Sequence, residues 1–174
     1  MSRMYQDYKD LLSAFQSHGV KYLVVGGYAV IYHSQPRFTK DIDVFIKADP
    51  ENANAIYAAL SAFGAPLQDI RPEDFTDGNN FFRFGHEPRS FDILPAIPGV
   101  EFDAAWDRRV EIEIDRATEF KANFISAEDL IASKLASGRP QDLADVHAIR
   151  KAAESARSKP GREQPPEPIQ GSSQ

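Results

Sequence analysis

The sequence predicts a single domain of mixed α and β structure, in which helices flank a β-sheet. The chain has 174 residues, of which 42% are hydrophobic and 26% charged, values that suit one globular domain with a sizeable core. Short apolar runs rich in β-branched residues are typical of buried strands. They alternate along the chain with longer segments of helical periodicity.

The first part of the chain predicts helices and strands in alternation. Gly26-Gly27 ends the first apolar run, and Pro36 ends the helical segment after it, because proline disfavours helix in the residue before it. Asp49 and Pro50 give the next helix a capping carboxylate and a proline at its first position. The predicted elements are a helix over 3–18, a strand over 20–25, a helix over 28–33, a strand over 39–47 and a helix over 50–63.

Shorter elements are expected in the second part of the chain. Ser126 is predicted to cap a helix, and the final helix is expected to turn Leu143, Val146 and Ile149 inward. The predicted elements are a loop over 65–79, strands over 81–84 and 90–97, a short helix or loop over 100–106, strands over 109–115 and 122–125, a helix from 126, and a helix over 141–156.

Composition restricts the function classes. We expect residues 1–156 to form the domain and residues 157–174, rich in Pro, Gly, Ser and Gln, to form a disordered tail. The absence of cysteine excludes disulfides and thiolate zinc sites, and the net charge of −6 argues against a general nucleic-acid coat protein. The N-terminus has no apolar signal region and no run reaches transmembrane length, so we expect a cytoplasmic protein without a membrane partner.

Residues 21–47 carry the chemistry. Asp41 and Asp43 project to one face of a strand, where two carboxylates repel unless a cation neutralises them. Magnesium takes such oxygen ligands and shares them with nucleotide phosphates. Gly26 and Gly27 let the backbone approach a phosphate at the N-terminus of the following helix. Alone, each half is more often a simple turn or a solvated strand edge.

The combined pattern is more specific. A strand, Gly-Gly, a helix and an apolar strand with Asp-x-Asp follow one another, with 13 residues between Gly27 and Asp41. This order resembles the signature of the DNA polymerase β-like nucleotidyltransferase superfamily. The run Arg37-x-Thr39-Lys40-Asp41-Ile42-Asp43 resembles the abortive-infection (AbiEii-type) toxin nucleotidyltransferases and their small bacterial relatives, and Ser126–Val146 is similar to their second block. The resemblance implies a mixed β-sheet flanked by helices.

The resemblance also implies a third carboxylate from a neighbouring strand. Asp92 is the candidate, because it is the only acidic residue in the apolar run 91–97; a structural aspartate bonded to the backbone is the alternative. The implied mechanism uses two divalent cations, Mg²⁺ or Mn²⁺. Asp41 and Asp43 would bind the metal that escorts the triphosphate, and Asp92 would join them at the metal that activates the acceptor hydroxyl.

Six residues are expected to bind the nucleotide. Lys134 falls on an otherwise apolar side of its helix, and related toxins place a lysine of this block near the triphosphate; a snorkelling surface lysine is the alternative. Arg139, Asp142 and Asp145 match the same block or pair at the helix terminus, and their roles stay open. The predicted nucleotide-binding residues are Gly26, Gly27, Arg37, Thr39, Lys40 and Lys134.

The expected activity is transfer of a nucleoside monophosphate from an NTP to a hydroxyl acceptor. In a toxin-like protein the acceptor is RNA, particularly tRNA, or a protein, and the expected partner is an antitoxin or a second copy of the chain. A small-molecule nucleotidyltransferase of the antibiotic-modifying kind is the alternative. A non-catalytic nucleotide-binding or antitoxin-like partner has the same fold, but all three aspartates are present, which favours an enzyme.

Overall fold

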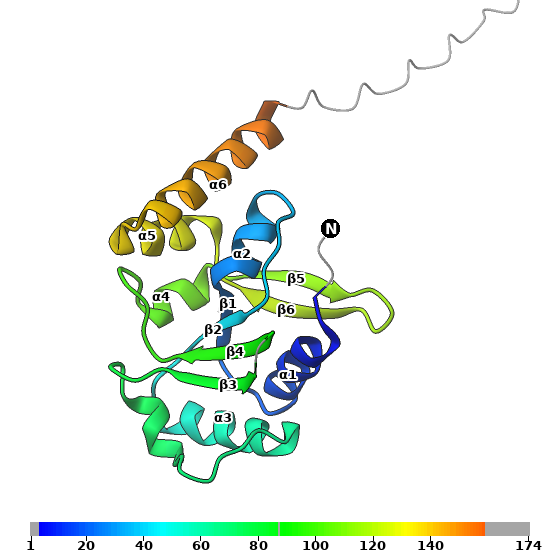
Figure 1. Ribbon diagram of the computed structural model, residues 1–174, viewed down its shortest axis with the longest axis vertical. Helices are drawn as coiled ribbons and strands as arrows, with labels where there is room; N and C mark the ends of the chain where they lie inside the picture. Colours follow the sequence, from blue (N-terminus) through cyan, green and yellow to red (C-terminus); the bar gives the residue numbers. More distant parts are fainter. Residues whose placement is uncertain (1–3, 87, 159–174) are drawn as a thin grey trace, which may run out of the picture.

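The computed structural model describes residues 4–86 and 88–158, which form a six-stranded sheet with helices around it (Figure 1). In chain order the elements are α1 (Gln6–Ser17), β1 (Tyr22–Val25), α2 (Gly26–His33), β2 (Ile42–Ile46), α3 (Pro50–Phe63), the 3₁₀ helix η1 (Pro72–Thr76), β3 (Phe82–His86), β4 (Arg89–Leu94), α4 (Phe102–Asp107), β5 (Val110–Asp115), β6 (Phe120–Phe124), α5 (Ala127–Ser137) and α6 (Pro140–Ser158).

The sheet is mixed, as the resemblance implies. Its strand order is β3-β4-β2-β1-β6-β5. Neighbouring pairs alternate in direction: β3/β4, β1/β2 and β5/β6 are antiparallel, whereas β2/β4 and β1/β6 are parallel. The parallel pair β2/β4 at the centre of one half is the part of the sheet that matters for the site, because it sets Asp43 directly beside Asp92.

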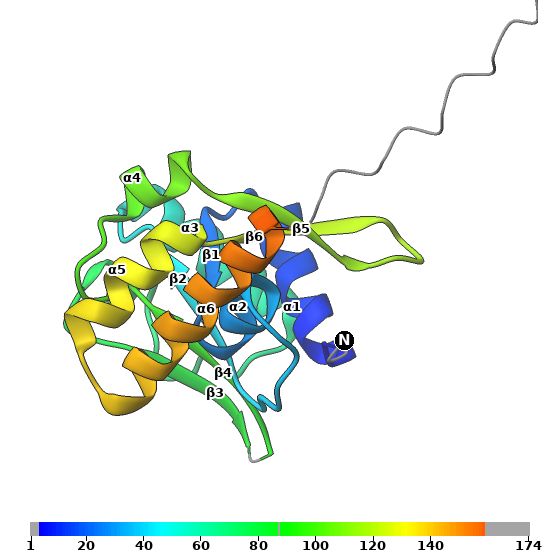
Figure 2. The ribbon, with the colours of Figure 1, turned by 90° about the horizontal axis from the view of Figure 1, so that it is seen from above.

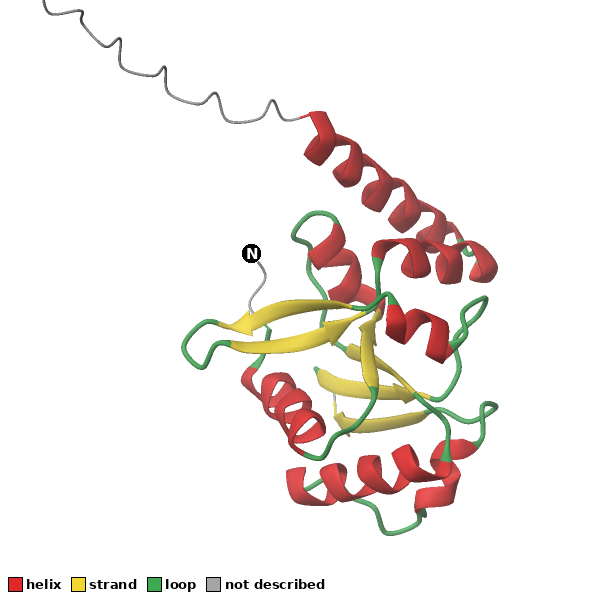
Figure 3. Ribbon diagram, turned by 180° about the vertical axis from the view of Figure 1, so that it is seen from behind, coloured by secondary structure: helices red, strands yellow, loops and turns green. Residues whose placement is uncertain are grey.

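Helices α1 and α3 contact each other and cover one face of the sheet (Figure 3). Ile42, Val44 and Ile46 alternate along β2 and are all fully buried, as their period of two predicts. Helices α2, α5 and α6 contact one another on the far side of the molecule from α3 (Figures 1 and 2). Every helix in residues 4–86 and 88–158 is too short or too polar to cross a lipid bilayer.

The predicted helix ends are confirmed where capping chemistry is local. The side chain of Asp49 accepts a hydrogen bond of 2.7 Å from the backbone N–H of Asn52, and Gly64 ends α3 at a φ of +94°. The hydroxyl of Ser126 accepts from the backbone N–H of Asp129 at 3.1 Å and caps α5.

Two expectations for the end of the domain need correction. Leu143 was expected to face inward with Val146 and Ile149, but it is 50% exposed, whereas the other two are buried. Leu143 lies in the first turn of α6, and this helix turns Asp142 and Asp145 inward instead. Helix α6 continues to Ser158, two residues into the predicted tail; residues 159–174 lie outside the described part of the chain.

Candidate active site

The predicted site residues meet in a cleft of about 440 Å³ beside the ends of β2 and β4. Gly26 and Lys134 do not line this cleft. Two of the lining residues, Phe38 and Arg83, were missed by the sequence reasoning. The lining residues are Gly27, Arg37, Phe38, Thr39, Lys40, Asp41, Asp43, Arg83 and Asp92.

The sheet register brings the carboxylates together. Asp43 on β2 pairs with Asp92 on β4, and the two parallel strands turn these side chains to the same face. Asp41 precedes β2 and does not belong to the strand, although the sequence predicted a strand from residue 39. It still shares the cleft with the other two carboxylates. The three predicted carboxylates therefore line one cleft, and their role as metal ligands stays a prediction.

The electrostatic environment of Asp43 disfavours its charged form. Burial, the neighbouring carboxylate of Asp92 and the charge of Asp41 raise the pKa of Asp43 to about 7. The positive charge of Lys134 acts in the opposite direction, but it does not offset them. A carboxyl group with a raised pKa on a cleft wall is a candidate functional group.

Asp92 is held by an arginine on the next strand. Arg83 on β3 is the antiparallel register partner of Asp92, and its Nε and Nη2 donate to the two carboxylate oxygens at 2.8 and 3.0 Å. The Asp92 side chain is 11% exposed and that of Arg83 is 55% exposed. Arg83, Asp92 and Asp43 thus form one row across three neighbouring strands.

Asp41 is tied to β4 by hydrogen bonds. The hydroxyl of Ser90 donates to its Oδ1 at 2.8 Å. The hydroxyl of Tyr8 on α1 donates to the carbonyl oxygens of both Lys40 and Ser90, the second at 3.0 Å. Burial raises the pKa of Tyr8, so this phenol remains a donor at any ordinary pH. Helix α1 therefore fixes the segment that carries Asp41 against β4.

The glycine pair lies inside α2 rather than before it. The sequence predicted that the helix begins near Tyr28, but it begins at Gly26, which has a φ of +65°. A Cβ on Gly26 would lie 2.0 Å from Oδ2 of Asp43, and one on Gly27 would lie 2.5 Å from the hydroxyl of Thr39. Because glycine has no side chain, Gly26 and Gly27 leave room for the side chains of Asp43 and Thr39. Contact of this helix start with a phosphate stays a prediction.

Lys134 belongs to an ion-pair cluster behind the cleft. Its Nζ lies 2.9 Å from Asp145 and 3.4 Å from Asp142, and its side chain is 13% exposed, so it is not the snorkelling lysine of the alternative interpretation. Arg139 pairs with Asp142 at 2.8 Å, and Arg37 pairs with Asp145 at 2.5 Å. The second pair links the cleft wall to α6.

The two aspartates of this cluster are ionised. The hydrogen bond from Arg139, against the effect of burial, holds the pKa of Asp142 below its usual value. Burial opposes ionisation of Asp145, but the hydrogen bond and charge of Lys134, together with Gln141 and Arg37, outweigh it and lower the pKa. Asp142 and Asp145 therefore act as anchors for Lys134 and Arg37.

The residues of the cleft suit a divalent cation. Within residues 4–86 and 88–158, no three His, Cys, Asp or Glu side chains are grouped as a ready-made metal site. Ser90 donates to Asp41 and Arg83 donates to Asp92. Carboxylate oxygens from adjacent strands are nevertheless the donors that Mg²⁺ and Mn²⁺ accept, and the pKa of Asp43 is raised by burial first and then by the neighbouring carboxylates of Asp92 and Asp41.

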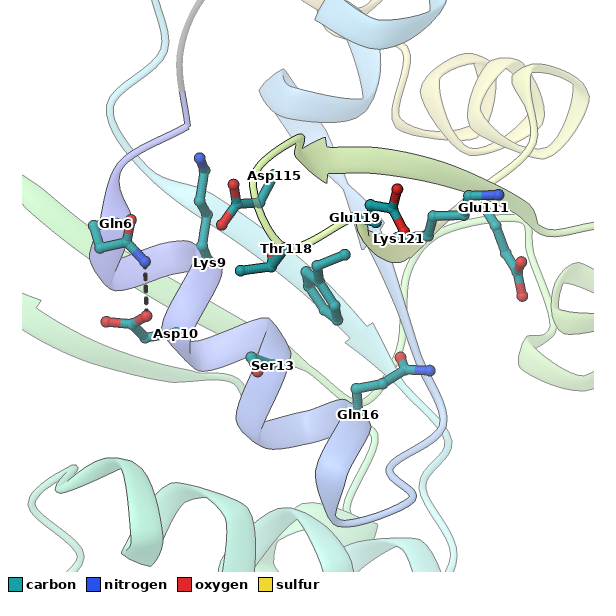
Figure 4. A pocket seen from close by; sticks show the side chains of 11 residues that line it. Gln6, Lys9, Asp10, Ser13, Gln16, Glu111, Asp115, Thr118, Glu119 and Lys121 are labelled. Atoms are coloured by element: carbon teal, nitrogen blue, oxygen red, sulfur yellow. Dashed lines mark hydrogen bonds between the residues drawn. The ribbon is translucent and has the colours of Figure 1, made fainter.

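A second hollow lies away from the carboxylates. It occupies about 530 Å³ between α1 and the β5–β6 hairpin, and Figure 4 shows polar side chains from both elements around it. Lys9, Asp10 and Ser13 come from the helix, and Glu119 and Lys121 from the hairpin. Its wall shares no residue with the cleft.

A family model described as a nucleotidyltransferase of unknown function (DUF6036) matches residues 2–153. The chain belongs to this family. The match confirms the nucleotidyltransferase resemblance, whereas the finer likeness to AbiEii-type toxins remains a prediction. No curated protein matches the sequence significantly.

Solved structures of nucleotidyltransferases share the fold of this DUF6036 member. The lincosamide antibiotic adenylyltransferase LnuA, in a lincomycin-bound crystal structure, is 17% identical, with a TM-score of 0.54 over 87% of this chain and 99% of that chain. The antibiotic-resistance factor ANT(2″)-Ia is 16% identical, with a TM-score of 0.53 over 86% and 82%. A Thermotoga maritima protein (TM1012), described as a nucleotidyltransferase, is 15% identical, with a TM-score of 0.53 over 88% and 97%.

We predict that Gly26→Ala disrupts the site more than an alanine at another glycine with positive φ. The new Cβ would lie 3.0 Å from the Cβ of Asp43, so rotation of the carboxylate does not remove the clash. Gly19→Ala is the matched control, because Gly19 has a φ of +67° and nothing within 4 Å of an added Cβ. Chemical denaturation should show Gly26→Ala to be less stable than the control by roughly 1–3 kcal/mol. Equal losses would contradict this account.

We predict that Asp43→Asn stabilises the metal-free protein at pH 8. The folded-state pKa of Asp43 is raised to about 7, so folding takes up a proton between about pH 4 and pH 7, and stability falls as pH rises through this window. Asparagine removes this loss, and we expect a gain on the order of 4 kcal/mol at pH 8, from about three pKa units, that vanishes near pH 4.

Urea denaturation in the presence of a chelator at pH 4, 6 and 8 measures this difference. Asp69→Asn is the control, because Asp69 is exposed on a loop. A gain for Asp43→Asn that is the same at all three pH values would show that ionisation of the buried Asp43 carboxyl group is not its cause.

Proposed function

We propose that the protein transfers a nucleoside monophosphate from an NTP to a hydroxyl group with the help of Mg²⁺ or Mn²⁺. The observation that carries this proposal is the pairing of Asp43 with Asp92 in one cleft beside the start of α2. The two carboxylates face each other, and the pKa of Asp43 is raised to about 7. Such a site favours a cation, and membership in a nucleotidyltransferase family supports the same activity.

The residues of the cleft divide the task. Asp41, Asp43 and Asp92 would hold the two cations, which, when bound, neutralise charge on the attacking and leaving oxygens of an in-line displacement. The acceptor oxygen bonds to the α-phosphorus, the bond from the α-phosphorus to the bridging oxygen breaks, and pyrophosphate leaves. Asp92 also accepts the proton of the acceptor hydroxyl in this scheme, because it lies on the strand next to Asp43.

The nucleotide-binding residues surround these carboxylates. Gly27, in the first turn of α2, lines the cleft and Gly26 directly precedes it, so the N–H groups and partial positive charge of this helix start would suit a phosphate. Arg37, Thr39 and Lys40 line the same cleft and would contact the triphosphate or the acceptor. Lys134 would contribute through its charge, which already acts on Asp43 from behind the cleft wall.

RNA, particularly tRNA, or a protein is the proposed acceptor, within a toxin–antitoxin or phage-defence system of the cytoplasm. The resemblance of residues 37–43 and 126–146 to AbiEii-type toxins supports this choice. An antitoxin or a second copy of the chain is the proposed partner.

A small hydroxylated molecule is the second candidate acceptor. LnuA and ANT(2″)-Ia, which share the fold, are an antibiotic adenylyltransferase and an antibiotic-resistance factor. The cleft volume of about 440 Å³ also falls within the range of sites for drug-sized ligands. Phe38, 81% exposed on the cleft wall, offers a flat apolar surface to either acceptor class.

The test is incubation of the full chain with each α-labelled NTP, Mg²⁺ or Mn²⁺, and separate pools of tRNA, protein and small hydroxylated compounds. We expect label on one pool only, and no transfer in the presence of a chelator. Asp43→Asn should reduce transfer at least about 100-fold, because loss of metal-held charge stabilisation costs several kcal/mol in the transition state.

Asp69→Asn is the matched control for this substitution and should transfer at the wild-type rate. Transfer that survives Asp43→Asn would refute the assignment of the site. Binding of an NTP without transfer to any pool would instead support the non-catalytic, antitoxin-like alternative.

A further inference from the structure

Arg83 engages both oxygens of Asp92, the carboxylate proposed as the third cation ligand. Its guanidinium donates from Nε to Oδ1 of Asp92 at 2.8 Å and from Nη2 to Oδ2 at 3.0 Å, so both oxygens are engaged at once. The two residues are also register partners on β3 and β4, so the backbone holds them opposite each other. A paired fork of this kind is the strongest geometry that arginine and carboxylate adopt.

A cation that binds Asp92 must therefore compete with Arg83. Both place positive charge at the same carboxylate, and these two positive charges repel each other. The Arg83 side chain is 55% exposed, so it has room to leave, whereas Asp92 is 11% exposed and stays on the cleft wall. The movable partner is the arginine.

A phosphate in the cleft would give Arg83 another partner. The arginine lines the same cleft as Gly27, Arg37 and Lys40, which are the residues expected to face a triphosphate. A guanidinium binds a phosphate with the same fork that it presents to a carboxylate. A triphosphate that binds in the cleft would therefore supply an anion for Arg83 and, at the same time, further oxygen ligands for a cation.

We propose that Arg83 is a counter-ion gate, which neutralises Asp92 while the cleft lacks a nucleotide and transfers to a phosphate when one arrives. This inference rests on the proposed nucleotidyl transfer. Its consequence is that cation and nucleotide bind cooperatively, because each removes the obstacle to the other, and the linkage must be reciprocal. The gate would prevent the site from holding a divalent cation before its substrate is present.

The chain contains a matched control for this arrangement. Arg108 donates from Nε and Nη2 to the two oxygens of Asp129 at 3.0 and 2.7 Å, with side-chain exposures of 46% and 6%. Neither residue lines the cleft. Arg108→Gln therefore removes the same charge and the same kind of fork without touching the site.

The test measures Mn²⁺ binding to the full chain at pH 8 without nucleotide, from the electron paramagnetic resonance signal of free Mn²⁺. Arg83→Gln should bind Mn²⁺ at least about fivefold more tightly than the wild type, because a competing positive charge within a few ångströms is gone. Arg108→Gln should bind as the wild type does. Arg83→Lys keeps the positive charge but loses the paired hydrogen bonds, so its Mn²⁺ affinity should lie between those of the wild type and Arg83→Gln. This variant replaces Arg83→Gln in the test if the glutamine variant does not fold.

A second arm titrates preformed Mg²⁺–inorganic triphosphate by calorimetry, which needs no knowledge of the base. Arg83→Gln should bind this ligand at least about fivefold more weakly than the wild type and Arg108→Gln, because the phosphate has lost its guanidinium partner. Opposite signs in the two arms are the signature of a gate. A purely structural arginine would weaken both, and a purely phosphate-binding one would leave Mn²⁺ binding unchanged, so either result overturns the gate.

The experiments can refute the proposed gate and the proposed function independently of each other. Unchanged or weaker Mn²⁺ binding by Arg83→Gln, in a protein whose wild type transfers nucleotides and whose Asp43→Asn variant does not, refutes the gate alone. An Asp43→Asn variant that still transfers refutes the assigned activity, whatever the Mn²⁺ arm gives.

Discussion

The repulsion between the carboxylates of Asp43 and Asp92 is the constraint on which the rest of the site depends. The parallel pairing of β2 and β4 sets them side by side, so neither can move away without a change of register. Gly26 leaves space for one carboxylate, and Arg83 binds the other. The pKa of Asp43 is nevertheless raised to about 7. The fold therefore keeps an unfavourable charge arrangement, as active sites commonly do.

Local chemistry is the part of this structure that the sequence predicts well. The cap of Asp49, the stop at Gly64 and the buried face of β2 each depend on residues a few positions apart. The joint projection of Asp41 and Asp43 follows from the period of a strand. Asp92 was predicted as the third carboxylate from the family resemblance, and in the structure it lies on β4 beside Asp43.

The missed features depend on non-local pairing. Arg83 meets Asp92 because β3 and β4 pair in this register, and Gly85, with a φ of +92° and no room for a Cβ beside the carbonyl of Arg89, permits the close approach of the two strands. No spacing rule along the chain gives that register. Lys134 is similar: its helix was predicted, but the aspartates that hold it lie on α6.

The arginine forks at Asp92 and Asp129 show why the surroundings, rather than the pair, decide the role. Asp129 lies at the start of α5 and also accepts the Ser126 hydroxyl at 3.0 Å, so its charge is fully used in holding α5 and α4 together. Asp92 has the same fork, but a second carboxylate lies beside it in the next strand. One guanidinium pairs with Asp92 without neutralising Asp43, whose charge is relieved by a proton below about pH 7 and would be relieved above it by a cation shared with Asp92. The same interaction is thus a structural clamp in one place and a replaceable counter-ion in the other.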